Sequence, residues 1–146
     1  MLTTHQQAIN QFLKTVGIQN QLADLPGMAA PYAYTDSIYM GIPIRVVLDQ
    51  DKYVYANMCL GYVPKMNVAP LYRRLLTLSA MTIGIYFCIN DMDNAILLRS
   101  SRIVEGLDAN EFKAMIDSIC AWFLQFGPNL ITEFQIPPQP SAYSIT

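Results

Sequence analysis

Residues 85–116, IYFCINDMDNAILLRSSRIVEGLDANEFKAMI, carry the pattern that decides the fold of this chain. Apolar residues alternate through the first part and just before it, which is typical of a β-strand with one buried face: Ile83, Ile85, Phe87 and Ile89. Residues 91–94, DMDN, are rich in the side chains that favour a turn. Residues 95–104 predict the returning strand. The stretch therefore predicts an antiparallel hairpin that leads into a helix.

The helix after the hairpin has a marked start. Asp108 is a suitable N-cap residue and Glu111 stands three positions later, which is the capping-box arrangement with Asp in place of Ser or Thr. Leu107 and Phe112 are spaced as a hydrophobic staple across that cap. A stripe of core residues follows at helical spacing: Phe112, Met115, Ile116, Ile119, Cys120 and Phe123.

The C-terminal part of the chain contains helix-breaking residues. We expect Gly127 and Pro128 to interrupt the helix, and residues 130–134 to add a further turn. Residues 135–146 are rich in proline and are predicted to form a flexible tail. These boundaries give a single domain over residues 1–134.

A second helix is predicted before the hairpin, from Asn67 as a candidate N-cap to about Ala80. One of its faces carries three leucines: Leu71, Leu75 and Leu78. Tyr72 and Leu76 add apolar area outside that face, so this helix is expected to make contacts on two sides.

Residues 32–62 are dominated by strand patterns. They predict three strands. The first consists of two short pieces, residues 32–35 and 38–40, and a break near Gly41 and Pro43 follows it. The second covers residues 44–48 and the third residues 53–62. Along residues 53–62 neither alternating face is strongly polar, so we expect a helix to cover one face and a partner to cover the other.

A first amphipathic helix precedes these strands. Its apolar residues recur at helical spacing: Ile9, Phe12, Leu13 and Val16. Thr3 or Thr4 is expected to cap its start, and Gly17 to end it. The full order, α-β-β-β-α-β-β-α, predicts an α+β domain with an antiparallel sheet and helices packed on it.

Composition narrows the function classes. The chain has 146 residues, of which 53% are hydrophobic and only 14% are charged, so it is not disordered overall. A formal net charge of −2 excludes nucleic-acid binding through a basic face. The N-terminus lacks the basic and apolar regions of a secretory signal. The longest uncharged stretch, residues 75–90, is too short for a membrane span.

The cysteines and the few catalytic residue types predict a cytoplasmic, non-enzymatic protein without a cofactor. Three widely spaced cysteines with no CxxC pattern indicate free thiols in a reducing compartment. His5 is the only histidine, which excludes a two-histidine metal site. The glycines form no phosphate-binding pattern. A small-molecule site, the other possibility, would depend on polar residues of the strands: Arg45, Asn57, Arg99 and Arg102.

Tyrosines concentrate in the first block of strands: Tyr32, Tyr34, Tyr39, Tyr53, Tyr55 and Tyr62. Tyrosine is favoured at protein interfaces because it buries a rigid ring and keeps a polar tip. Simple β-propensity explains the same enrichment. Both interpretations remain open on the sequence alone.

Two segments together resemble a known superfamily. They are YVYANMCLGYVP (residues 53–64) with the following helix, APLYRRLLTLSA, and the hairpin with its apolar-Glu-Gly-Leu-Asp step into a capped helix. This series of elements is similar to the type III secretion chaperone-like fold, which includes the CesT-type chaperones and the YbjN-like proteins.

The resemblance implies a dimeric protein that holds an extended segment of a partner protein. The dimer contact that it implies lies on the second helix and the next strand: Tyr72, Leu75, Leu76, Ser79 and Tyr86. The implied partner groove uses the outer face of the first strand block: Tyr39, Tyr53, Tyr55 and Tyr62. The segment LLRSSRIVEGLDANEF resembles the YbjN-like branch equally, and the alternative is therefore a regulatory or stress-related protein of that kind.

Overall fold

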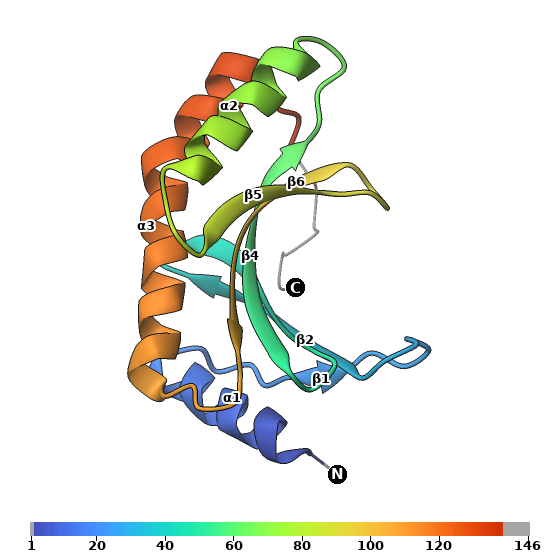
Figure 1. Cartoon of the computed structure of the whole chain (residues 1–146), viewed down its shortest axis with the longest axis vertical. Helices are drawn as coiled ribbons and strands as arrows, with labels where there is room; N and C mark the ends of the chain where they lie inside the picture. The colour runs from blue at the N-terminus through green and yellow to red at the C-terminus, as the bar shows by residue number, and fades with distance from the viewer. Residues whose placement is uncertain (1, 139–146) are drawn as a thin grey trace.

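Residues 2–138 are described by the computed structural model, and they form three helices and six strands (Figure 1). Residue 1 and residues 139–146, which include most of the predicted tail, lie outside the described residues. The elements in chain order are α1 (Thr4–Thr15), β1 (Ala23–Asp24), β2 (Tyr32–Tyr39), β3 (Ile42–Asp49), β4 (Tyr53–Tyr62), α2 (Val68–Ala80), β5 (Ile85–Asn90), β6 (Ala95–Ile103) and α3 (Ala109–Phe134).

The strands form one antiparallel sheet in the order β1-β2-β3-β4-β6-β5. This architecture confirms the predicted α+β class. The short strand β1 is an addition to the predicted order, since it lies within residues predicted to be a connector. It is held by pairing with β2 and by the side-chain amide of Gln6 in α1, which donates to the Asp24 carboxylate at 2.7 Å.

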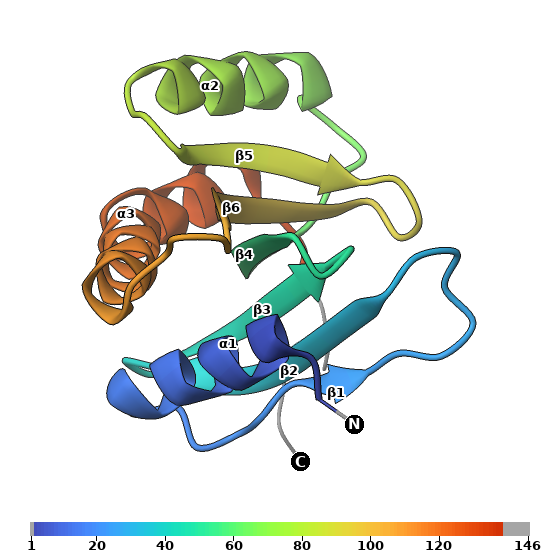
Figure 2. The same cartoon turned by 60° about the horizontal axis from the view of Figure 1, so that its bottom comes forward.

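One face of the sheet packs against helices. In β2 to β6 every second residue points to this face, and the apolar side chains among them share a continuous core with α1, α2 and α3. Figure 1 shows α1 and α3 on the same side of the sheet, and Figure 2 shows α2 lying along β5 at one end. Phe12 of α1 contacts the fully buried Phe112 of α3, with ring centroids 5.7 Å apart.

Local capping fixes where the first and last helices begin. The Thr3 hydroxyl accepts from the backbone amide of Gln6 at 3.0 Å, and the Gln6 side chain accepts from the backbone amide of Thr3 at 2.8 Å. Asp108 accepts from the Glu111 amide at 2.7 Å. These starts agree with the sequence patterns. Asn67 does precede α2, but its backbone is left-handed (φ 59°) and its side chain makes no capping bond.

Helix α3 continues through Gly127 and Pro128 to Phe134, so the predicted interruption is wrong. Proline in a helix removes one backbone hydrogen bond and costs about 3 kcal/mol. The last turns bury Leu130 almost completely, and Ile131 and Phe134 pack against the same core. This burial offsets the cost, because each fully buried leucine contributes roughly 1.5–3 kcal/mol.

The two short pieces predicted for the first strand form one strand, whereas the break predicted near Gly41 is present as a turn. β2 is continuous, and a two-residue turn at Met40 and Gly41 joins it to β3, both residues having positive φ. Pro43 lies inside β3, opposite Ile38 of β2. The turns at residues 49–52 and 91–94 lie where the sequence predicts them.

The start of the segment predicted to be a loose tail packs against the end of β4. Ile136 is buried in the core, and the Pro137 carbonyl accepts from the Tyr62 amide at 2.8 Å. This approach requires a glycine at position 61, because a Cβ there would lie 2.2 Å from the Pro137 oxygen. Gly61 also has a φ of +133° and follows a bulge in the register of β4 with β6.

Candidate functional site

The first candidate surface lies where α2 meets the edge strand β5, and we call it the α2–β5 surface. It contains a hollow of about 220 Å³ lined by apolar side chains: Tyr72, Leu75, Leu76, Phe87, Cys88 and Ile89. Of these, Leu75 is buried, but Leu76 is 71% exposed. The surface therefore combines an apolar projection with an apolar depression.

Strand β5 ends the sheet on this side, so one row of its backbone groups points away from β6. The Phe87 amide belongs to that row and donates to the Ser79 hydroxyl at 2.9 Å. Ser79 in turn donates to the Leu75 carbonyl at 2.8 Å. Ser79 is thus a link that holds α2 against β5.

Replacing Ser79 by alanine is expected to lower the free energy of unfolding by about 1 kcal/mol, since the Phe87 amide loses its acceptor. Urea unfolding measures this cost, and hydrogen exchange at the Phe87 amide should become faster. Thr77→Ala is the matched control, because Thr77 makes the same bond to the carbonyl four residues earlier but accepts nothing from β5. Equal costs and an unchanged exchange rate would contradict the link.

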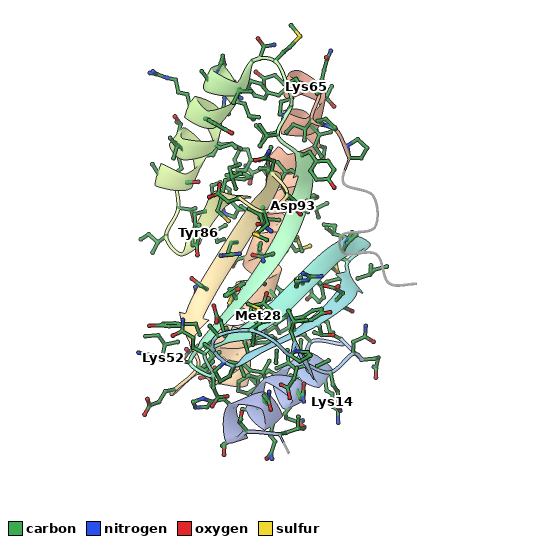
Figure 3. All side chains as sticks on the ribbon, turned by 90° about the vertical axis from the view of Figure 1, so that its right-hand side faces the viewer. Lys14, Met28, Lys52, Lys65, Tyr86 and Asp93 are labelled. Atoms are coloured by element: carbon green, nitrogen blue, oxygen red, sulfur yellow. The ribbon has the colours of Figure 1, made fainter. Side chains whose placement is uncertain are left out.

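The structure brings most of the predicted dimer residues together. Tyr72, Leu75 and Leu76 line the hollow, and Ser79 lies one turn beyond them. Tyr86 is different: its neighbours in β5 line the hollow, while its own side chain points to the opposite face of the sheet and lies 3.3 Å from the Ser101 hydroxyl. Figure 3 shows Tyr86 on β5, with α3 behind the sheet.

The second candidate surface is the face of the sheet opposite the core, and we call it the helix-free face. Its apolar cluster consists of strand residues only: Ala95 and Leu97 with Cys59 and Cys88. Burial raises the pKa of the Cys59 thiol to about 11 and also raises that of Cys88. Both thiols are therefore protonated at neutral pH and add to the apolar character of this face.

An aromatic row also crosses the helix-free face, one row away from that cluster. The register places the fully buried Val47 between Tyr34 and Tyr55. Arg45 stacks on the Tyr34 ring, 4.7 Å from its centroid, and Arg99 stacks on the Tyr55 ring at 4.2 Å. Burial, together with a hydrogen bond to Tyr32, raises the pKa of the Tyr55 hydroxyl, so it stays protonated.

A polar row runs between the aromatic row and the apolar cluster. The strand registers align five residues across β2, β3, β4, β6 and β5: Asp36, Arg45, Asn57, Arg99 and Tyr86. Asp36 binds Arg45 through two bonds of 2.7 and 2.9 Å. Asn57 is buried and accepts from Arg99 Nε at 2.7 Å. The sequence pattern predicts Arg45, Asn57 and Arg99 as polar residues of the strands, but it does not predict their alignment, which depends on the register.

The tyrosines predicted to bind a partner are not all on this face. Tyr55 lies at its centre, and Tyr53 lies at its end, beneath Lys52. Tyr62 is opposite Ala95 and shares that side. Tyr39 points to the helices, where its hydroxyl donates to Asp117 of α3. Burial and this carboxylate raise the pKa of Tyr39 to about 12.

The chemistry-bearing residues elsewhere serve structural contacts. His5 contacts the Asp51 carbonyl at 2.6 Å, and the Thr3 hydroxyl donates to the Asp51 carboxylate, so both hold α1 against the β3–β4 turn. Arg102 hydrogen-bonds the Ser101 carbonyl and does not join the polar row.

Within residues 2–138, no three acidic, histidine or cysteine side chains are placed to hold a metal ion. The helices of the same residues include none with the length and hydropathy of a membrane span.

Comparisons with known proteins agree with this architecture. Among solved structures, an uncharacterized protein from Methanothermobacter thermautotrophicus is similar, with a TM-score of 0.57 and 15% identity over 89% of this chain and 99% of that one. A chain of the ExsC–ExsE complex gives 0.53 and 10%, with coverages of 93% and 95%. The Yersinia pestis type III secretion chaperone SycH, in complex with a stable fragment of YscM2, gives 0.51 and 14%, with coverages of 87% and 99%.

The sequence itself matches a family model. No curated protein matches it. The CesT_Tir_1 model matches residues 3–135, which is nearly the whole described domain. This match confirms the resemblance to the type III secretion chaperone-like proteins. The chain therefore belongs to the CesT_Tir_1 family.

Proposed function

We propose that this chain is a non-enzymatic protein-binding module that forms a homodimer through the α2–β5 surface and holds an extended segment of a partner protein. The observation that carries the proposal is the exposed Leu76 beside an apolar hollow on the free edge of the sheet. Family membership supports the same function.

The shape of the α2–β5 surface suits pairing with a second copy. In a two-fold dimer the same patch meets itself, so a projection must find a depression within that patch. Leu76 and the hollow provide the two parts on neighbouring elements. Tyr72, 37% exposed, lines both this hollow and the adjoining one on the outer side of α2, and it adds an aromatic anchor to the contact.

The extended segment is assigned to the helix-free face. Tyr34 and Tyr55 offer rings on that face, and the neighbouring cluster is apolar. Two of the similar solved structures are complexes, one of a type III secretion chaperone with a fragment of another protein. The three free cysteines, in turn, support a reducing compartment such as the cytoplasm.

Leu76→Asp is expected to convert the dimer to a monomer, raising the dissociation constant at least about tenfold because a charge enters an apolar contact. Light scattering after size exclusion should give about twice the 16.4 kDa chain mass for the wild type and the chain mass for the variant. Leu124→Asp is the control, since Leu124 is 54% exposed on α3, away from this surface. A monomeric wild type, or a dimeric L76D protein, would overturn the dimer.

Capture of binding partners from native lysate, followed by limited proteolysis of the complex, tests whether the chain holds an extended segment of a partner. A single partner with one short protected segment is the expected result. A homodimer with no enriched partner would instead favour the alternative, a regulatory protein of the YbjN-like kind, and would overturn the proposed holding function.

A further inference from the structure

We propose that Arg99 is a carboxylate-binding site on the helix-free face, and that it selects partner segments with an acidic residue between apolar ones. This inference rests on the proposed function, since it names the chemistry of the segment that the face holds.

The guanidinium of Arg99 is held firmly but incompletely satisfied. Its Nε donates to the buried Asn57 at 2.7 Å, and its plane stacks on the Tyr55 ring at 4.2 Å. Within residues 2–138, neither of its terminal nitrogens makes a hydrogen bond or an ion pair. The side chain is therefore held in place with both terminal nitrogens of its guanidinium group available to donate hydrogen bonds to a ligand.

Arg99 also forms no ion pair within residues 2–138. Arg45, its counterpart on the same polar row, forms an ion pair with Asp36 at 2.7 Å. The ion pairs found in the described part of the chain involve His5, Arg45, Arg74 and Lys113, but not Arg99. The half-buried Arg99 is bordered by Leu97 and by the protonated thiol of Cys88. A carboxylate is the ligand that matches both the charge and the paired donors, and such bonds are among the stronger ones in proteins.

The surroundings indicate that the carboxylate belongs to an extended peptide. Arg99 lies between the aromatic row, with Tyr55, and the apolar cluster, with Leu97. Neighbouring rows on one face of a sheet are two residues apart along a strand, which is roughly 6.5–7 Å. Side chains on one side of an extended peptide repeat at the same distance. A segment lying along the strands therefore fits if it reads apolar-x-acidic-x-apolar.

The test is selection from a random twelve-residue peptide library displayed on phage, using the full chain as bait. The wild type is expected to enrich Asp or Glu with apolar residues two positions away on each side. Arg99→Gln should lose the acidic preference, and Arg99→Glu should replace it with Lys or Arg. Arg74→Gln is the control, because Arg74 lies on α2 and pairs with Glu133. Circular dichroism establishes that each variant is folded.

Binding of one enriched peptide then measures the effect. Its acid-to-amide version should bind the wild type about tenfold to a hundredfold more weakly, as expected for loss of a charge-assisted pair. The same change should alter binding to the folded R99Q protein less than about twofold. Enriched peptides without an acidic preference would overturn this inference and leave the proposed function standing. A library that yields no binder would overturn the holding function together with the inference.

Discussion

Replacing Gly61 by alanine is expected to lower the free energy of unfolding by about 2–3 kcal/mol, because two separate costs act at this position. The first is conformational, since a φ of +133° is rarely adopted by residues with a side chain. The second is steric: the new Cβ would lie 2.2 Å from the Pro137 oxygen and 2.9 Å from the Ile136 side chain. The Pro137 carbonyl is fixed by the Tyr62 amide, so it cannot retreat without losing that bond.

The matched control is Gly41→Ala. Gly41 also has a positive φ, +78°, but no atom lies within 4 Å of a Cβ built there, so only the conformational cost of about 1 kcal/mol applies. Urea unfolding followed by circular dichroism compares the two. A chain truncated after Gln135 isolates the steric part, since Gly61→Ala should then cost little more than Gly41→Ala. Equal costs for the two variants in the full chain would show that the contact with Pro137 carries no energy.

Phe112→Ala is expected to destabilise the protein still more, by about 3–5 kcal/mol, since Phe112 is fully buried at the start of α3. The substitution leaves a cavity and removes the ring that contacts Phe12 of α1. Amide exchange in α1 should therefore increase more than exchange in α2, which packs on β5 at the other end of the sheet.

A truncation on the exposed side of the same helix provides the comparison for Phe112. Leu124 is 54% exposed, and Leu124→Ala should change the free energy of unfolding by less than about 0.5 kcal/mol. If Phe112→Ala cost no more than this control, or if α1 kept its exchange protection, the contact between α1 and α3 would not support the N-terminal helix.

The parts of the fold that could be predicted from sequence are those set by neighbouring residues. Thr3 and Asp108 cap their helices with side chains that accept from backbone amides three residues later. In the turn at residues 91–94, Asn90 and Asp93 accept in the same way from backbone amides two residues later. Strand alternation in β4 also holds: Val54 lies in the core, whereas Tyr55 lies on the other face.

The features of the fold that the sequence pattern does not predict depend on contacts between distant residues. Helix α3 passes Pro128 because Leu130 is buried by elements far away in the chain. The alignment of Asn57 with Arg99 requires the register of β4 with β6, which no local pattern gives. The orientation of Tyr39 could have been predicted from its spacing. Tyr39 is five residues after Tyr34, so on a continuous strand the two side chains must point to opposite faces.

The unequal ends of the sheet limit how many copies can join. At one end β1 offers only two residues, and at the other β5 offers six. Growth into a fibre needs two usable ends on every subunit, so that each new copy leaves a place for the next. The proposed two-fold pairing through β5 would use this end on both copies, so that no β5 edge is left for a third copy. An assembly of that kind would close at two subunits rather than polymerise.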